Sequence, residues 1–190
     1  MSVLNRCAWV KLNNPLYVKY HDDEWAVPVH DDQKLFEFIT LEGAQAGLTW
    51  ETILNRRENY RKAFKNFDPK KVARMTKNDV EKLMENTGII RNRLKIESTI
   101  TNAQNFLKIQ KEFGTFSDYM WGFVNNKQIQ NKRATHRSIP AVTPIATRLS
   151  LDMRKRGFKF FGPTICYAHM QAVGMVNDHT TNCFRYKEVQ

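Results

Sequence analysis

The sequence predicts an all-α protein, and three observations support that prediction. Apolar residues recur at the helical spacing of three and four along almost the whole chain of 190 residues. No segment of strand length alternates between apolar and polar residues. Capping residues and glycines stand between the periodic segments, where helices begin and end. Because the connections are short, we expect one compact unit over residues 1–190.

The first predicted helix spans residues 31–46. Asp31 or Asp32 can cap its start, and Gly47 can end it. Similar signals predict the further helices over these segments: residues 49–64, capped by Thr49; a helix opened by Asp68-Pro69; residues 76–87, with a capping box of Thr76 and Asp79 and a stop at Gly88; residues 92–112; residues 143–156, opened by Thr143-Pro144 and closed by Gly157; and residues 164–175. Residues 125–141 are polar and are predicted to form a loop.

The charge of the chain predicts a polyanionic partner. Thirty Lys and Arg residues against 19 Asp and Glu give a formal net charge of +11. Residues 119–190 carry 11 bases and 3 acids, whereas residues 1–118 carry 19 bases and 16 acids. A membrane is not expected, because no polybasic segment adjoins an apolar anchor. The longest uncharged run, residues 160–177, suits a buried helix better than a membrane span.

Glu42 is the one charged residue between Phe38 and Trp50. On the predicted helix over residues 31–46, it falls in the same apolar stripe as Leu35 and Phe38. Burying a carboxylate costs several kcal/mol unless it finds donors or an opposite charge. A chain that keeps a carboxylate there uses it for a structural ion pair or for chemistry, and both interpretations are open at this point.

Metal-compatible residues stand at both ends of the chain, namely Cys7, His21, His179 and Cys183. Two Cys and two His make a closed tetrahedral zinc shell, which is a structural site. The spacing between Cys7 and His21 is no finger signature, so four unrelated residues are an equal alternative.

Three cysteines are an odd number, and the segment from Met1 to Arg6 shows no secretory signal. Reduced thiols or metal ligands are therefore expected, and the predicted compartment is the cytoplasm. Cys166 and His169, three apart, are a rival ligand pair, or they simply belong to the last apolar helix.

Five aromatic residues flank the first cysteine, the first histidine and the Glu42 segment: Trp9, Tyr17, Tyr20, Trp25 and Trp50. Aromatic residues on helices usually pack in a core. Their flat faces can also sandwich a planar ring. An aromatic box around a buried carboxylate is what a nucleobase pocket requires, because stacking holds the base and the carboxylate accepts hydrogen bonds from its N–H groups.

Residues 77–112 are predicted to form two helices joined by a tight apolar turn, residues 87–91. Backbone N–H groups in such a turn, at a helix N-terminus, can bind a DNA phosphate without reading the sequence. An ordinary helical hairpin is the alternative.

Five segments stand in a recognisable order along the chain: residues 6–10 (RCAWV), 20–25 (YHDDEW), 41–50 (LEGAQAGLTW), 157–160 (GFKF) and 177–179 (NDH). They resemble the motifs of the bacterial 3-methyladenine DNA glycosylase I family, the constitutive Tag type. The resemblance runs from Arg6 to Cys183. It implies a helix-hairpin-helix DNA glycosylase fold with a zinc clasp joining the termini. It also implies an enzyme that acts on double-stranded DNA containing alkylated adenine, flips out 3-methyladenine and hydrolyses its N-glycosidic bond, leaving an abasic site.

The resemblance assigns roles to single residues. One structural Zn²⁺ is expected on Cys7, His21, His179 and Cys183. Glu42 matches the carboxylate that contacts the flipped base, with Tyr20 beside it. Trp50 matches the aromatic residue that stacks on the base. Further candidates for the aromatic wall of the pocket are Trp9, Trp25 and Tyr17. The expected DNA contacts are Gly47 and Leu48, which probe the gap in the duplex, the hairpin residues Gly88, Ile89, Ile90 and Arg91, and Lys159.

The chain departs from the family pattern at Ala26, where glycine is common. Relative to the wider superfamily, Ile90 replaces the second hairpin glycine, and the catalytic aspartate is missing, as in the Tag family. N3-methylation makes adenine cationic, so the base leaves the sugar as a neutral molecule, and breaking the bond needs less catalysis than for an undamaged base. Stacking aromatic residues and Glu42 can then select the cationic ring over neutral adenine. We expect a monomer. The alternatives are a non-catalytic helical DNA-binding module with a structural zinc, and a zinc hydrolase, which a closed four-ligand shell excludes.

Overall fold

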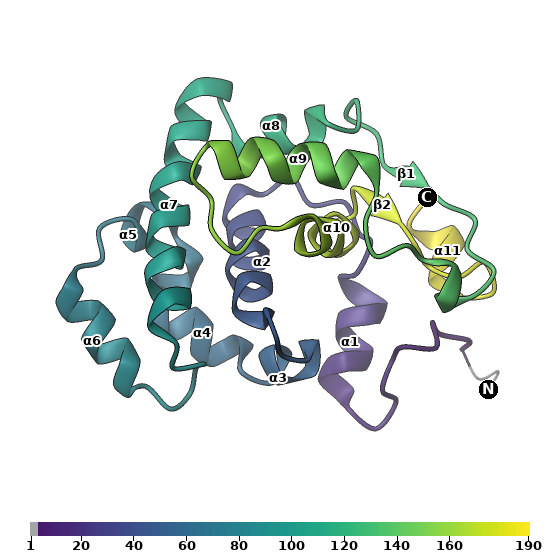
Figure 1. Ribbon diagram of the computed structural model, residues 1–190. Helices are drawn as coiled ribbons and strands as arrows, with labels where there is room; N and C mark the ends of the chain where they lie inside the picture. Colours follow the sequence, from purple (N-terminus) through teal and green to yellow (C-terminus); the bar gives the residue numbers. More distant parts are fainter. Residues whose placement is uncertain (1–3) are drawn as a thin grey trace.

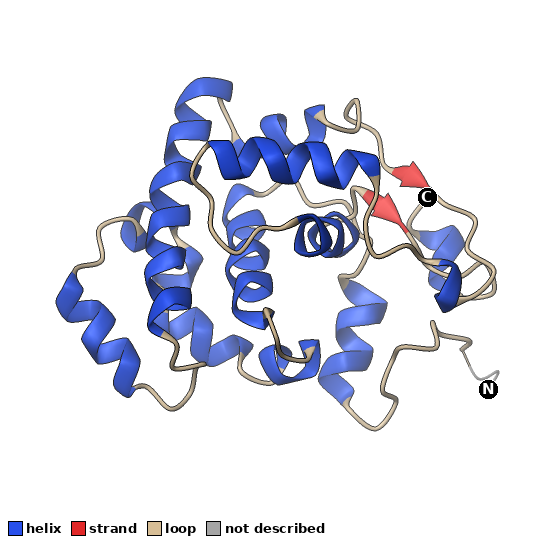
Figure 2. Ribbon diagram, in the orientation of Figure 1, coloured by secondary structure: helices blue, strands red, loops and turns tan. Residues whose placement is uncertain are grey.

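The computed structural model describes residues 4–190, and helices dominate the described part (Figures 1 and 2). In chain order the helices are α1 (Pro15–Asp23), α2 (Asp32–Gln45), α3 (Trp50–Leu54), α4 (Arg57–Ala63), α5 (Pro69–Val72), α6 (Lys77–Glu85), α7 (Arg93–Phe113), α8 (Phe116–Gly122), α9 (Pro144–Lys155), α10 (Pro163–Ala172) and α11 (Arg185–Glu188). Two 3-10 turns, η1 (Lys65–Phe67) and η2 (His136–Ser138), and two short strands, β1 (Ile129–Gln130) and β2 (Val176–Asn177), complete the elements of this part. The all-α prediction is confirmed.

Helix α2 forms the centre of the core, between α7 and α10 (Figure 1). The Asp31 side chain caps its start by accepting from the amide of Lys34. From Leu35 to Ala44 every residue of the helix is buried, including the polar ones. At its other end the Lys95 ammonium donates to the carbonyls of Ala44 and Ala46, at 2.8 and 2.6 Å. The helix therefore presents side chains to neighbours on all of its faces.

Most predicted helices are observed within a few residues of their expected bounds, and the Thr76–Asp79 capping box is present. The segment 49–64, however, is two helices, α3 and α4, rather than one. The break at Asn55 and Arg56 lets Arg57 donate to Glu24 and Glu37. The apolar positions keep helical spacing across so short an interruption, which is why periodicity alone did not reveal it.

The predicted loop over residues 125–141 contains β1 and η2. Strand β1 pairs in parallel with β2, with Ile129 opposite Val176 and Gln130 opposite Asn177. Two-residue strands are too short to show any alternation, so the sequence could not predict them. The pairing places this loop beside the segment that leads to His179.

The two ends of the described chain lie together (Figure 1). The amide of Phe184 donates to the carbonyl of Asn5 at 2.9 Å, and the side chain of Asn5 donates to the carbonyl of Asn182 at 2.7 Å. Part of the segment examined for a secretory signal, residues 1–3, lies outside the described residues. Within residues 4–190 no helix has the length and apolar character needed to cross a membrane.

Candidate functional site

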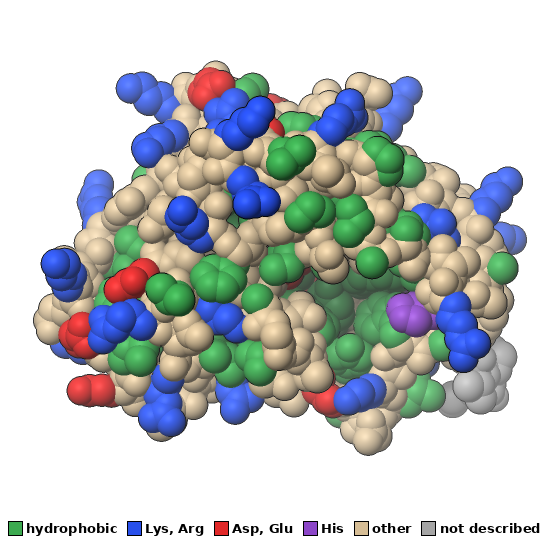
Figure 3. All heavy atoms as spheres, viewed as in Figure 1, with side chains coloured by type: hydrophobic (Ala, Val, Ile, Leu, Met, Phe, Trp, Pro, Cys, Tyr) green, Lys and Arg blue, Asp and Glu red, His purple; other side chains and the backbone are tan. Residues whose placement is uncertain are grey.

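A cleft of about 290 Å³ opens where α1, α2 and α10 meet the start of α3. It is lined by Trp9, Tyr17, Tyr20, Trp25, Glu42, Gln45, Trp50, His136, Ile139, Ala168 and Gln171. Figure 3 shows a hollow in this face of the molecule whose visible walls are largely hydrophobic side chains. All five predicted aromatic residues and Glu42 therefore line one cleft.

Glu42 lies at the inner side of this cleft and is 3% exposed. Its Oε2 is 2.8 Å from Nδ1 of His169, which α10 carries and which is fully buried. Its Oε1 is buried and has no hydrogen-bond partner within the described residues. Burial raises the pKa of Glu42, and the neighbouring imidazole opposes that rise. One carboxylate oxygen thus has its hydrogen-bond donor within the protein, and the other still lacks one.

The aromatic rings pack edge to face or tilted around the carboxylate. The ring centroids of Tyr20 and Trp50 are 5.2 Å apart, and those of Trp9 and Tyr17 are 5.6 Å apart. Burial and the charge of Glu42 raise the pKa of Tyr20 well above its usual value, so its hydroxyl stays protonated and can donate. The indole N–H of Trp50 is buried without an acceptor among residues 4–190. The Tyr20 hydroxyl and the Trp50 indole N–H are therefore two donors that a planar ligand with hydrogen-bond acceptors can use.

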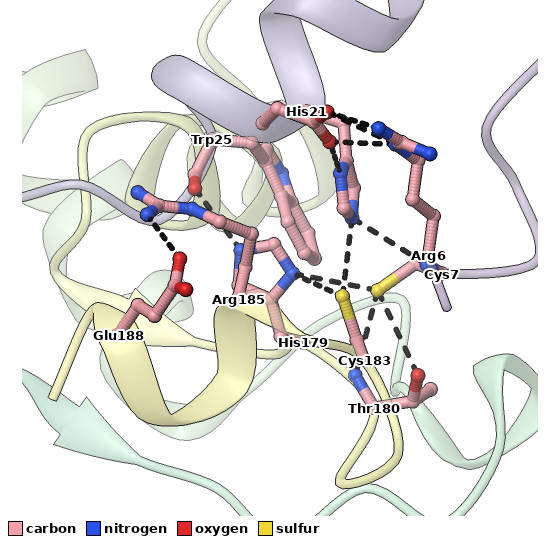
Figure 4. A network of polar contacts seen from close by, with 10 residues as sticks. Arg6, Cys7, His21, Trp25, His179, Thr180, Cys183, Arg185 and Glu188 are labelled. Carbon is pink, nitrogen blue, oxygen red and sulfur yellow. Dashed lines mark hydrogen bonds and ion pairs between the residues drawn. The ribbon is translucent and has the colours of Figure 1, made fainter. Parts of the chain in front are cut away.

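The four predicted metal ligands come together although they stand at opposite ends of the chain (Figure 4). Cys7, His21, His179 and Cys183 are all buried, and their ligand atoms lie within 4.8 Å of one another. The Sγ of Cys183 is 3.5 Å from Nε2 of His21 and 3.5 Å from Nδ1 of His179, and the Sγ of Cys7 is 3.4 Å from the latter. Tetrahedral zinc with thiolate and imidazole ligands places sulfur and nitrogen about 3.5 Å apart. The donor set therefore fits zinc.

Neighbouring groups orient the two imidazoles as metal ligands require. The remaining nitrogen of His21 is 2.7 Å from the carboxylate of Asp22, which Arg6 also contacts. The remaining nitrogen of His179 is 3.2 Å from the backbone carbonyl of Trp25. Both contacts fix the ring tautomer with the proton on the outer nitrogen, so the inner nitrogen offers its lone pair to the cluster (Figure 4).

The candidate DNA contacts lie on several segments around the cleft. Gly47 has φ 77°, the left-handed conformation that ends α2, and Leu48 after it is 41% exposed. Lys159 is exposed, and its peptide is held from both sides by the buried Asn102 of α7, at 2.8 and 3.0 Å. An exposed Leu side chain and an exposed Lys side chain are thus carried by well-fixed backbone.

The hairpin turn differs from the expectation. The amides of Gly88 and Ile89 donate to Asn86, and the amide of Ile90 donates to the hydroxyl of Tyr60 at 3.1 Å. These three N–H groups are therefore committed inside the protein. The amide of Arg91 has no acceptor among residues 4–190, and its side chain is exposed. Among the four residues of the turn, Arg91 is therefore the one whose amide is left without an acceptor in the described part of the chain.

The basic excess over residues 119–177 is mostly exposed. Arg133 pairs with the buried Asp178, and Arg156 pairs with Asp152. The remaining bases are exposed and form no ion pair within the described part: Lys127, Lys132, Arg137, Arg148, Arg154, Lys155 and Lys159. Positive side chains are spread over the face that surrounds the hollow (Figure 3). These unpaired bases can meet a polyanion without first breaking an ion pair with an acidic side chain.

The sequence analysis did not assign Gln45, His136 or Gln171 to the cleft, and it did not identify His169 as the partner of Glu42. From the sequence, His169 has two interpretations, a rival metal ligand with Cys166 or a member of the last apolar helix; it lies on that helix, and its imidazole contacts Glu42. The isolation of Glu42 signalled that a partner was needed, but nothing in the sequence said which residue it was. Gln45 follows Glu42 by three residues, so helical spacing alone could have placed it on the same face.

Residues 9–186 match the family described as methyladenine glycosylase. DNA-3-methyladenine glycosylase 1 of Escherichia coli (strain K12) is 50% identical over 183 residues, which are 96% of this chain and 97% of that protein. The crystal structure of a 3-methyladenine DNA glycosylase I superposes with a TM-score of 0.92 at 50% identity, over 95% of this chain and 98% of the other. A 37% identical structure of 3-methyladenine DNA glycosylase I from Staphylococcus aureus, described as showing how that enzyme recognises 3-methyladenine, also has a TM-score of 0.92 and covers 96% and 97% of the two chains.

Proposed function

This chain belongs to the methyladenine glycosylase family, and we propose that it is a DNA repair glycosylase that removes 3-methyladenine from alkylated DNA. The observation that carries the proposal is the state of Glu42, a buried carboxylate that lines a cleft walled by aromatic rings and has one oxygen committed to His169 and the other without a hydrogen-bond partner among residues 4–190. A module that binds only the DNA backbone needs no buried acid, so the non-catalytic alternative leaves Glu42 without a role.

Recognition requires the damaged base outside the duplex, because its glycosidic bond cannot be reached inside the stack. Trp50 is the stacking residue in this proposal, and Trp9, Trp25 and Tyr17 complete the aromatic walls. The unpaired Oε1 of Glu42 accepts from the exocyclic amine of the base, and the protonated hydroxyl of Tyr20 helps to orient the base. The cationic ring gains cation–π attraction from the desolvated aromatic faces, which undamaged adenine does not.

The reaction is hydrolysis of an N-glycosidic bond. The bond between C1′ and the base nitrogen breaks, its electron pair moves to the base, and 3-methyladenine leaves as a neutral molecule. The oxygen of water bonds to C1′, its proton passes to solvent, and an abasic site remains. The negative charge of Glu42 favours the cationic base and the positive charge that develops as the bond stretches. We propose Glu42 and Tyr20 as the residues that touch the reacting base.

We infer that Cys7, His21, His179 and Cys183 hold one zinc ion. The ion would supply a closed four-ligand cross-link between the two ends of the chain. The fit of the sulfur–nitrogen distances and the oriented imidazoles support this inference. A shell closed by four side chains leaves no ligand position for water, so a hydrolytic role for the metal is not proposed.

The proposed DNA-binding elements are the α6–α7 hairpin of a helix-hairpin-helix fold and the exposed bases around the cleft. Arg91 would contact a phosphate with its free amide and its side chain, and Lys159 would do so with its ammonium. Leu48, exposed beside the cleft, would occupy the space that the flipped base leaves in the duplex. Together these contacts bind double-stranded DNA through its backbone and shape rather than its sequence.

The proposal is tested by incubating the purified protein with methylated duplex DNA and identifying the free bases by chromatography. The expected result is 3-methyladenine in solution and an equal amount of abasic sites in the DNA. Tight DNA binding without any base release would overturn the glycosylase proposal and favour the non-catalytic module.

A further inference from the structure

His169 contacts Glu42 on the side that faces the protein interior. It lies on α10, 127 positions along the chain from Glu42, and its side chain is fully buried. Its Nδ1 is 2.8 Å from Oε2 of Glu42. This is the one hydrogen bond that the carboxylate makes within residues 4–190, because Oε1 has no partner there. The two oxygens of Glu42 therefore have different environments.

The surroundings of His169 favour one protonation state. Its Nε2 is buried and has no partner in the described part of the chain. The ring of Phe161 packs edge to face against the imidazole at 5.4 Å. An imidazolium would leave a second buried N–H, on Nε2, without an acceptor, which is costly. A neutral imidazole that carries its proton on Nδ1 donates to Oε2 and leaves only a weak acceptor unpaired. The pair then carries one net negative charge, on Glu42.

Other titratable groups near Glu42 do not replace this contact. Tyr20 from α1 and Cys166 from α10 are buried and neutral near Glu42, and neither forms a hydrogen bond to its carboxylate within the described residues. Lys95 from α7 donates to the last carbonyls of α2 rather than to the carboxylate. Burial alone would favour the protonated form of Glu42, so a fixed donor at Oε2 matters for keeping it ionised.

Resting on the function proposed above, we propose that His169 is a positioning residue that acts through Glu42. By donating from Nδ1 to Oε2, it fixes the rotamer of the carboxylate and leaves Oε1 as the acceptor for the exocyclic amine of the base. It also stabilises the ionised form of Glu42. Because the imidazole itself stays neutral, the negative charge of the pair remains available to the cationic base.

The first test compares two substitutions of His169, one that removes the hydrogen-bond donor and one that keeps a donor. His169→Phe removes the donor but keeps a ring against Phe161, whereas His169→Asn places an amide N–H near the position of Nδ1. In single-turnover release of 3-methyladenine, His169→Phe should lower the maximal rate about tenfold at neutral pH. The KM measured under steady-state conditions should change less than about threefold. The acid limb of the pH–rate profile should move to higher pH, because the Glu42 carboxylate has lost its donor. His169→Asn should stay within about threefold of wild type.

The second test asks whether His169 acts through Glu42. In a Glu42→Gln background, His169→Phe should lower release by less than about twofold further, because the two residues act as one unit. Equal losses from His169→Phe in both backgrounds, or equal losses from His169→Asn and His169→Phe, would overturn the proposal. Thermal unfolding of each variant, measured in parallel, identifies any that simply fails to fold.

A readout independent of activity completes the design. Nitrogen-15 chemical shifts of the imidazoles in the wild type, assigned by the signals that His169→Asn removes, should show a neutral His169 protonated on Nδ1. A doubly protonated ring, or a proton on Nε2, would contradict the proposed hydrogen bond. If the wild type released no 3-methyladenine but showed the Nδ1 proton, the glycosylase proposal would fail while the His169–Glu42 hydrogen bond stood.

Discussion

The imidazole of His179 donates from Nε2 to the backbone carbonyl of Trp25, with 3.2 Å between the two atoms. The two rings also pack edge to face, with their centroids 4.6 Å apart. Trp25 lines the cleft and His179 belongs to the metal cluster, so the two candidate sites share one wall. A metal that fixes His179 therefore also fixes part of the cleft.

We predict that the purified protein contains one zinc ion per molecule and that Cys183→Ala loses it. The loss of a ligand opens the clasp between the chain ends, so the melting temperature should fall by about 10 °C or more. Elemental analysis and thermal unfolding measure the two effects. Cys166→Ala is the matched control, because Cys166 is also buried but lies outside the cluster. The Cys166→Ala protein should therefore keep its zinc. Metal-free wild type prepared without chelators, or equal stability of Cys183→Ala, would refute the zinc site.

We predict that stability falls in acid because of the ion pairs around Arg57. Burial alone would raise the pKa of Glu24, but the hydrogen bonds and charges of Arg57 and Lys34 outweigh it and lower that pKa to about 2. The stabilisation is therefore fully present above the unfolded value of 4.5 and is lost as the pH falls from 4.5 towards 2. It amounts to about 3 kcal/mol at most. Urea unfolding of wild type and Glu24→Gln at several pH values measures it.

In that experiment Glu24→Gln should be less stable than wild type at neutral pH, and the difference should shrink in acid. Glu58→Gln is the control, since Glu58 is largely exposed and its pair with Arg61 should contribute little. A constant difference between wild type and Glu24→Gln across this pH range would show that Glu24 does not carry the effect.

The sequence was sufficient for features that depend on neighbouring residues. The Asp31 cap, the Thr76–Asp79 capping box and the burial of Glu42 all follow from local spacing, and each is observed. Helical spacing also placed Glu42 on a face that the fold buries. These features share a short range, so a single segment contains the information that specifies them.

Features set by long-range packing could not be predicted. His169 meets Glu42 across 127 positions, and no local pattern specifies that contact. The amide of Ile90 is committed to Tyr60, which a reading of the turn alone could not reveal. Ala26 has φ 64°, a left-handed conformation that glycine adopts without strain. The alanine at this position therefore carries backbone strain that glycine would avoid.

We predict that binding to undamaged duplex DNA weakens steeply with salt, because neutralisation of phosphates by Lys and Arg dominates such binding. Arg91→Ala and Lys159→Ala should each lower the slope of log affinity against log salt by about one. Lys187→Ala is the control, because Lys187 is exposed on α11, on the opposite side of the molecule from the α6–α7 turn (Figure 1). Salt-independent binding, or an equal effect of all three substitutions, would contradict the proposed DNA contacts.

We predict that Tyr20→Phe lowers release of 3-methyladenine by about threefold, with the stability unchanged. The aromatic ring against Trp50 remains, and only the hydroxyl that helps to orient the base is lost. Single-turnover base release measures this effect. A loss as large as that of Glu42→Gln would mean that the hydroxyl has a larger part in the reaction than orientation.

We claim that Glu42 selects 3-methyladenine, and the ratio of 3-methyladenine to 7-methylguanine released from methylated duplex DNA tests this selection. Both bases are cationic and both can stack on the aromatic walls, so neither charge nor stacking separates them. Glu42 can accept from the exocyclic amine of adenine, whereas guanine presents an O6 acceptor at the corresponding place. Wild type should therefore release 3-methyladenine and leave 7-methylguanine largely in place, and Glu42→Gln should lower 3-methyladenine release about 100-fold with the fold intact. Equal release of both bases by wild type would contradict the claim.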